Sequence, residues 1–208
     1  MEHPVREIAG IITTLTTGSP QQQRDTLSEY FLPDASFSHP FCRVPSFTRG
    51  ALPFARNTDS LWAILCIYRW YRTLSPNIEI AIDSAVLDQR TGTLYVNIHQ
   101  TFAVWFIPLY SARVRLLTVL HLEQRNCRIS REQAALSGPV HERPRYYVAS
   151  QEDLYQFNDC LQFLLPRAGP WLWSLWQLFS ALLCVLSAVA FLPVYYLLNS
   201  GRTAKKVV

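Results

Sequence analysis

The sequence predicts an α+β fold: a cone-shaped, curled antiparallel sheet packed on three N-terminal helices, with a C-terminal transmembrane helix. Two observations predict it. Apolar residues change from helical spacing to a period of two after Pro76, and no charged residue occurs between Arg167 and Arg202. The 208 residues therefore divide into three parts, namely a cone domain at 1–166, a membrane helix at 167–198 and a short basic tail at 199–208.

Three helices are expected in the first third of the chain. Residues 4–17 carry apolar side chains at helical spacing. A second helix opens at Ser19-Pro20, because serine is a good cap and proline suits a first turn. Asp59 can cap a third, aromatic-rich helix over 60–74.

Strands are expected in the middle of the chain, where apolar and polar residues alternate. The turn signal Thr91-Gly92 separates the first strand from a longer one. The expected strands are 78–83, 94–107, 113–124 and 145–149, with 128–133 as a further candidate, and 151–164 is expected to be a helix leading into the membrane.

The apolar segment from Trp171 to Leu198 is longer than the about 20 residues that a membrane span needs. Aromatic residues that prefer the headgroup level stand at both of its ends, namely Trp171, Trp173 and Trp176 at one and Tyr195 and Tyr196 at the other. A core helix is the alternative, but so small a domain could not cover this segment on all sides.

Composition excludes several classes of function. The net charge of +4 includes no block of like charges before the tail, so no nucleic-acid surface is expected. The five cysteines lack metal-ligand spacing, so neither a metal nor a cofactor is expected. The N-terminus has no export signal and no glycosylation acceptor occurs, which favours a domain in the cytosol.

The helix order and the stretch Tyr30-Phe31-Leu32-Pro33-Asp34-Ala35 resemble the nuclear transport factor 2-like superfamily. Tyr146-Tyr147 and Gln151-Glu152-Asp153 before a hydrophobic tail resemble, more narrowly, the fungal SigF-like proteins. The resemblance implies a cone with a pocket at its open end. It leaves function open, because members of the superfamily include enzymes, binding modules and dimerisation modules.

The resemblance also bears on catalysis. In the ketosteroid isomerase branch an Asp-Pro pair supplies the general base, and His39-Pro40 matches it here. The two hydrogen-bond donors of that branch match Ile11 and Leu120, which cannot donate. A site without such donors lacks what is usually the largest contribution to this catalysis.

The candidate pocket residues are His39, Trp62, Trp70 and Phe102. His39 either closes the pocket mouth or acts as a base. Asp34 is expected to be a turn or capping residue, and His99 to lie on the outer face of the sheet.

The sequence favours a membrane-tethered binding or scaffolding module with an apolar pocket for a small lipophilic ligand or a protein partner. The alternative is an isomerase, dehydratase or cyclase acting on a lipophilic substrate. The expected partners are the lipid bilayer, a lipophilic small molecule and a second copy bound through the sheet.

The expected location is the endoplasmic-reticulum membrane, with the domain facing the cytosol. The ending Lys205-Lys206-Val207-Val208 matches a dilysine retrieval pattern, which would need a cytosolic tail. A re-entrant hairpin would satisfy that rule, but each arm would be too short to cross a core of about 30 Å. A single span is therefore preferred.

Overall fold

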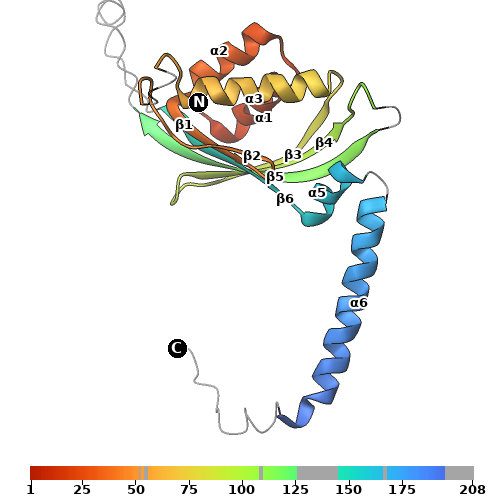
Figure 1. Ribbon diagram of the computed structural model, residues 1–208. Helices are drawn as coiled ribbons and strands as arrows, with labels where there is room; N and C mark the ends of the chain where they lie inside the picture. Colours follow the sequence, from red (N-terminus) through yellow and green to blue (C-terminus); the bar gives the residue numbers. More distant parts are fainter. Residues whose placement is uncertain (52, 54–55, 108–109, 126–144, 166–167, 195–208) are drawn as a thin grey trace, which may run out of the picture.

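The protein was analysed as a computed structural model that describes residues 1–51, 53, 56–107, 110–125, 145–165 and 168–194 (Figure 1). Helices α1 to α3 lie on one face of a curved sheet, and α6 extends away from one end of it. The elements, in chain order, are α1 (Pro4–Thr17), α2 (Pro20–Tyr30), β1 (Phe31–His39), β2 (Cys42–Val44), α3 (Ser60–Leu74), β3 (Glu79–Asp88), β4 (Thr93–Phe102), β5 (Ala112–Arg125), β6 (Arg145–Tyr155), α5 (Phe157–Leu164) and α6 (Ala168–Ala190).

The six strands form one open sheet in the order β2-β1-β6-β5-β4-β3. The expectation of an antiparallel sheet was wrong at one pair, because β1 runs parallel to β6. Strand β6 lies between β1 and β5 and runs antiparallel to β5. The α+β class is confirmed, and α5 is the second half of the helix that was expected at 151–164.

The three N-terminal helices begin and end where the sequence indicates. Ser19 forms a reciprocal capping box with Gln22, and Asp59 accepts the N–H of Trp62 at 2.9 Å. The helices press an apolar layer against the inner face of the sheet, with Ile8, Leu15, Leu27, Ile64, Leu94 and Leu120 fully buried. The core between the helices and the sheet is therefore mostly apolar.

Strand β4 ends at Phe102, five residues earlier than expected. The chain leaves the sheet here because backbone N–H groups that follow Phe102 bind to the C-terminal end of α3. The N–H of Ala103 donates to Ser75 Oγ at 3.0 Å, and the N–H of Trp105 donates to the carbonyl of Leu74 at 3.3 Å.

Strand β6 continues to Tyr155, so the helix expected from Gln151 was wrong over its first residues. Gln151 and Asp153 are polar side chains on the inner face, and they hide the alternation that marks a half-buried strand. Helix α5 begins only at Phe157.

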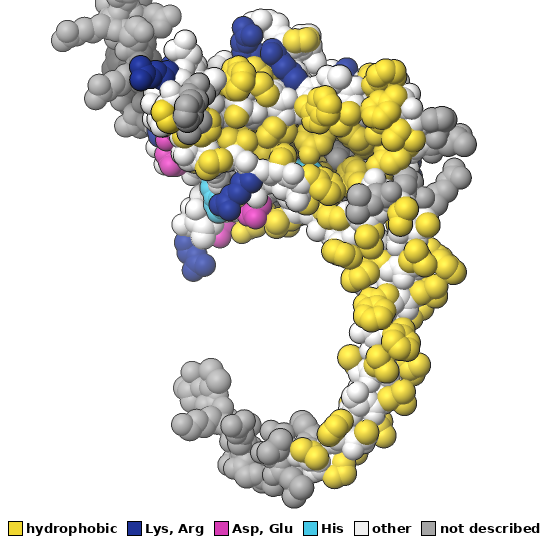
Figure 2. Space-filling view, in the orientation of Figure 1, with side chains coloured by type: hydrophobic (Ala, Val, Ile, Leu, Met, Phe, Trp, Pro, Cys, Tyr) yellow, Lys and Arg dark blue, Asp and Glu magenta, His cyan; other side chains and the backbone are white. Residues whose placement is uncertain are grey.

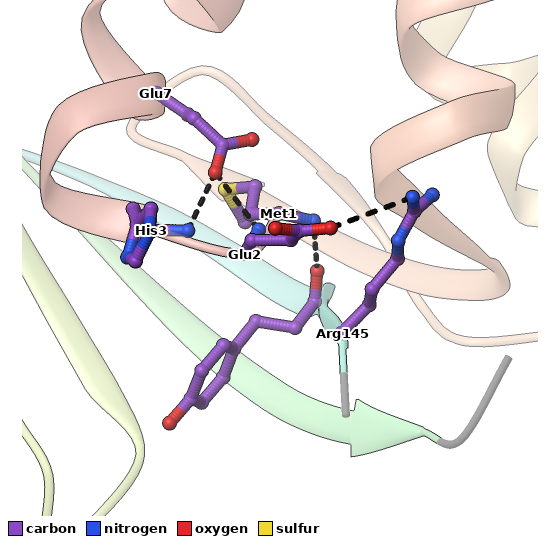
Figure 3. A network of polar contacts seen from close by, with 6 residues as sticks. Met1, Glu2, His3, Glu7 and Arg145 are labelled. Atoms are coloured by element: carbon purple, nitrogen blue, oxygen red, sulfur yellow. Dashed lines mark hydrogen bonds and ion pairs between the residues drawn. The ribbon is translucent and has the colours of Figure 1, made fainter. Parts of the chain in front are cut away.

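The chain start is fastened to the beginning of β6 (Figure 3). The Met1 amino group donates to the carbonyl of Tyr146 at 2.8 Å, and the Tyr146 N–H donates back to the Met1 carbonyl at 2.8 Å. Glu7 Oε1 accepts the N–H groups of Glu2, at 2.8 Å, and His3, at 2.5 Å. We call this set the N-terminal clamp.

Helices α5 and α6 form a tight corner. The rings of Phe157 and Trp173 lie 4.5 Å apart between centroids. A Cβ on Gly169 would lie 2.7 Å from the carbonyl oxygen of Leu161, closer than real Cβ contacts allow. The corner therefore depends on glycine at this position.

Some expectations fall on residues that the structure does not describe. These are the candidate strand at 128–133, the aromatic pair Tyr195 and Tyr196, and the basic tail at 199–208.

Candidate functional site

A cavity of about 280 Å³ lies at the open end of the domain, between α1, α3, the inner face of the sheet and α5. Its size is close to the lower limit of about 300 Å³ usual for small-molecule sites. Its lining is dominated by aromatic and aliphatic side chains, namely Thr16, His39, Phe41, Tyr68, Tyr71, Leu74, Ile78, Gln100, Phe102, Val104, Tyr110, Tyr155 and Phe163.

His39, at the end of β1, is enclosed by aromatic rings. Its centroid lies 5.1 Å from that of Tyr155, 5.4 Å from Tyr71 and 5.6 Å from Phe41. The Phe37 ring is nearly parallel to that of His39, with centroids 6.3 Å apart. Burial among these rings lowers the pKa of His39 to about 4, so the imidazole is neutral at pH 7.

Hydrogen bonds fix which nitrogen of His39 carries the proton. The backbone N–H of Phe41 donates to Nδ1 at 3.3 Å, and the Tyr71 hydroxyl lies 3.3 Å from the same atom. A backbone N–H can only donate, so Nδ1 accepts and the proton of the neutral ring resides on Nε2. No described residue accepts that Nε2–H. His39 is thus a hydrogen-bond donor, and its unprotonated nitrogen is already occupied.

Two tyrosines complete the polar groups near the mouth. Gln100 Nε2 donates to the Tyr155 hydroxyl oxygen at 3.2 Å, which leaves the Tyr155 O–H able to donate in turn. The Tyr110 hydroxyl donates to the carbonyl of Phe163 at 2.7 Å and ties the β4–β5 connection to α5. Burial raises the pKa of Tyr155 well above its usual value, so this hydroxyl stays protonated.

Behind the lining runs a chain of polar groups. Tyr68 donates to Gln151 Oε1 at 2.9 Å, Gln151 Nε2 donates to Asp153 Oδ1 at 3.1 Å, and Thr118 Oγ1 donates to the same oxygen at 2.7 Å. Burial raises the pKa of Asp153 to about 6, although the bonds from Thr118 and Gln151 act in the opposite direction. At pH 7 the carboxylate is mostly ionised, and no described Lys or Arg pairs with it.

The structure brings together two of the four expected pocket residues. His39 and Phe102 line the cavity. Trp62 and Trp70 do not, and with 54% and 60% exposed surface they were wrongly assigned to the interior. They occupy the face of α3 opposite its buried Ile64.

The remaining candidates lie away from the cavity. His99 is on the outer face of the sheet, where it contacts Asp83 and Arg115. Asp34 is a half-buried residue within β1 and does not line the cavity. Ile11 and Leu120 are both buried in the apolar core.

Sequence reasoning missed Tyr71, Tyr155 and Phe163. Tyr71 could have been found, because it follows Ile64 and Tyr68 at helical spacing along the buried face of α3. Tyr155 belongs to an inner-face series, 151, 153 and 155, once β6 is recognised as a strand. Phe163 has no such signal, since its position depends on how α5 folds back over the cavity.

Within the described part of the chain, no group of three His, Cys, Asp or Glu residues is placed to hold a metal ion. The side chains that line the cavity offer hydrogen bonding from neutral donors and aromatic contact, and Asp153 lies behind them.

Helix α6 is the one described helix long and apolar enough to cross a membrane. Its 23 residues extend about 35 Å at 1.5 Å per residue. Trp171 and Trp176 are exposed on its first turns, and Trp173 is half-buried against α5.

Comparison with known proteins yields a family. No curated protein matches the sequence. One similar solved structure is a protein with a ketosteroid isomerase-like fold from Catenulispora acidiphila, 13% identical over 76% of this chain and 91% of that chain, with a TM-score of 0.48. An M. tuberculosis LEH-like epoxide hydrolase is 9% identical over 78% and 92%, with a TM-score of 0.45.

A putative SnoaL-like polyketide cyclase from Jannaschia is 10% identical over 77% of this chain and 92% of that chain, with a TM-score of 0.45. A family model for the SigF NTF2-like domain matches residues 1–194, a range that includes α6. The chain therefore belongs to the SigF NTF2-like domain family.

Proposed function

We propose that this chain is a membrane-tethered binding module whose cavity holds a small lipophilic molecule bearing a hydrogen-bond acceptor. One observation carries the proposal: in a cavity of about 280 Å³ walled by aromatic rings, the neutral His39 keeps its Nε2–H without an acceptor among the described residues. A donor that faces an aromatic cavity and has no acceptor among the described residues suits a ligand oxygen, which would accept its hydrogen bond.

The Tyr155 hydroxyl supports the same ligand class. It receives the Gln100 amide and can donate its own proton. Two donors, with aromatic walls around them, suit a carbonyl, ester or ether oxygen on an otherwise apolar molecule.

The test is extraction of the full chain, purified in detergent, followed by mass spectrometry of the small molecules that it retains. Val104→Trp places an indole in the cavity wall and should remove the retained molecule. Val86→Trp is the matched control, because Val86 is 61% exposed on β3 and lies outside the cavity lining. A wild-type chain that retains nothing, or equal retention by both variants, would contradict the proposal.

His39→Phe tests the donor itself. The substitution keeps a ring of similar shape and removes the Nε2–H, so the retained molecule should bind about tenfold more weakly. His99→Phe on the outer face should leave retention unchanged.

An isomerase, dehydratase or cyclase acting on a lipophilic substrate is the second candidate, favoured by the pKa of about 6 at Asp153. Two facts weigh against it. Asp153 lies behind the cavity lining with Oδ1 occupied by Thr118 and Gln151, and the basic nitrogen of His39 is occupied by Phe41. Turnover of an extracted molecule that is lost in Asp153→Asn would favour the enzyme.

The tether in this proposal is α6, crossing the endoplasmic-reticulum membrane once with the domain in the cytosol. Its described side chains are almost all exposed, which would be unfavourable in water for so apolar a helix. A glycosylation acceptor added after Val208 should become modified in the lumen. An unmodified tail that external protease removes from sealed vesicles would contradict the single span.

A further inference from the structure

Five large apolar side chains are exposed together around the cavity mouth. We call them the apolar collar: Phe41 (54% exposed), Trp105 (71%), Phe106 (54%), Ile107 (44%) and Leu165 (52%). Figure 2 shows hydrophobic side chains gathered at the end of the domain from which α6 leaves, whereas the Asp and Glu side chains visible on this face lie towards the other end. Contiguous apolar surface of this kind marks an interaction site.

The collar belongs to the cavity mouth. Phe41 itself lines the cavity, and residues 105–107 lie between Val104 and Tyr110, which both line it. The Phe163 ring joins the two sides, with its centroid 5.9 Å from those of Phe41 and Phe102. Whatever covers the collar therefore also faces the opening of the cavity.

The collar is also continuous with α6. Leu165 follows the last residue of α5, and its carbonyl accepts the N–H of Gly169 in the first turn of α6 at 2.9 Å. The nearest Trp of α6, Trp171, is only six residues beyond Leu165 in the sequence. If Trp171 and Trp176 lie at the headgroup level, the collar must lie at or near the same level.

The residues of the collar suit that level. Trp105 and Phe106 contact each other, with ring centroids 5.5 Å apart, and sit in a stretch, 102–111, that has no charged residue. Trp side chains are enriched at the interface between water and lipid, and an uncharged loop can enter it without burying a charge.

We propose that the apolar collar is inserted in the interfacial layer of the membrane that α6 enters, so that the cavity mouth opens onto lipid. The proposal rests on the membrane tether proposed above. The ligand of the cavity would then exchange with the bilayer and not with bulk water.

The test uses the full chain reconstituted in phosphatidylcholine vesicles whose acyl chains carry bromine near the headgroup, which quenches nearby indoles. Trp105→Phe should lower the quenched fraction of the total tryptophan emission, because it removes an indole that lipid quenches. Trp62→Phe is the matched control. Trp62 is also exposed, but it lies twelve residues, or about 18 Å along α3, from Leu74, which binds the Trp105 amide.

Trp62→Phe should raise the quenched fraction, because it removes an indole that stays in water. A rise in both variants would overturn the collar insertion. Quenching of Trp105 that falls as the protein-to-lipid ratio rises would place a second copy on the collar and would also overturn it. Failure of the chain to float with the vesicles in a density gradient would instead contradict the tether, and with it the proposed function.

Discussion

The two ends of β6 are held by different kinds of contact. At its first residues the N-terminal clamp surrounds the strand with backbone hydrogen bonds and charges, including the Arg145–Glu2 pair at 3.6 Å (Figure 3). At its last residue, about 33 Å away, Tyr155 contacts the rings of His39 and Phe163.

The difference sets what kind of space lies at each end. At the clamp, a hollow of about 310 Å³ is lined by polar and charged side chains, among them Glu2, Glu7 and Arg145. At the other end, the cavity of about 280 Å³ is walled by rings such as the Tyr155–Phe163 pair, whose centroids lie 5.8 Å apart. The aromatic end therefore suits an apolar ligand, and the polar end does not.

The largest effect is expected from breaking the aromatic end. Phe163→Ala removes a ring that contacts Phe41, Phe102 and Tyr155, and it should lower the free energy of unfolding by about 3 kcal/mol. Thermal unfolding of the full chain in detergent measures this. Trp62→Ala is a surface control that should change it by less than about 0.5 kcal/mol. Equal effects would show that ring packing does not hold this end.

The aromatic end should also respond to pH through Asp153. Its pKa is 3.8 in the unfolded chain and about 6 in the fold, so its stabilising contribution is full below pH 3.8 and is lost as pH rises to about 6. Asp153→Asn should equal the wild type at acid pH and exceed it above pH 6, by up to about 3 kcal/mol. The gain in stability will be smaller if the side-chain NH₂ that Asp153→Asn introduces finds no hydrogen-bond acceptor. A difference independent of pH would contradict this.

The contribution of His39 to stability should show the opposite dependence on pH. Its pKa falls from 6.5 to about 4 on folding, so its contribution is full above pH 6.5 and is lost as pH falls towards 4. His39→Phe should therefore gain stability relative to the wild type on acidification, while Asp153→Asn gains on alkalinisation. Melting curves at several pH values for the two variants should diverge in these directions, and parallel curves would contradict the assignment.

A smaller effect is expected at the clamp. Glu7→Gln keeps one oxygen for the N–H groups of Glu2 and His3 but removes the charge near the N-terminus of α1, so stability should fall by about 1 kcal/mol. Retention of the bound molecule in the cavity should not change, because the clamp is at the far end of β6. Loss of retention would show that the two ends are coupled.

The smallest effect is expected from Glu2→Gln. The Arg145–Glu2 pair is 3.6 Å long and both side chains are about half exposed, so its loss should cost about 0.5 kcal/mol or less and should vanish at high salt. A larger loss that salt does not reduce would show that the charge pair fastens the clamp.

Local patterns were sufficient to predict the three N-terminal helices. Asp59 and the Ser19-Pro20 pair mark starts that depend only on neighbouring backbone, so the sequence contains them. The β1–β6 pairing was not predicted, because it joins residues more than a hundred positions apart and no local rule sets its direction.

The cavity was also predicted only in part. On α3, Tyr68 and Tyr71 share the helix face of the buried Ile64. Helical spacing could therefore have separated them from the outward-facing Trp62 and Trp70, which were chosen for their aromatic character. His39 was recognised through a resemblance in motif, whereas its role as a donor follows from the Phe41 amide, which only the folded structure reveals.

The absence of a side chain at Gly169 has a mechanical consequence. Helix α6 is about 35 Å long, and a helix longer than the local hydrocarbon thickness responds by tilting. Gly169 lies directly against the Leu161 carbonyl, so the corner between α5 and α6 is tightly packed. A tilt of α6 would therefore turn α5 with it. In the membrane-tethered arrangement proposed above, Phe163, one residue before the end of α5, would then move as a wall of the cavity, and bilayer thickness would set how wide the cavity is.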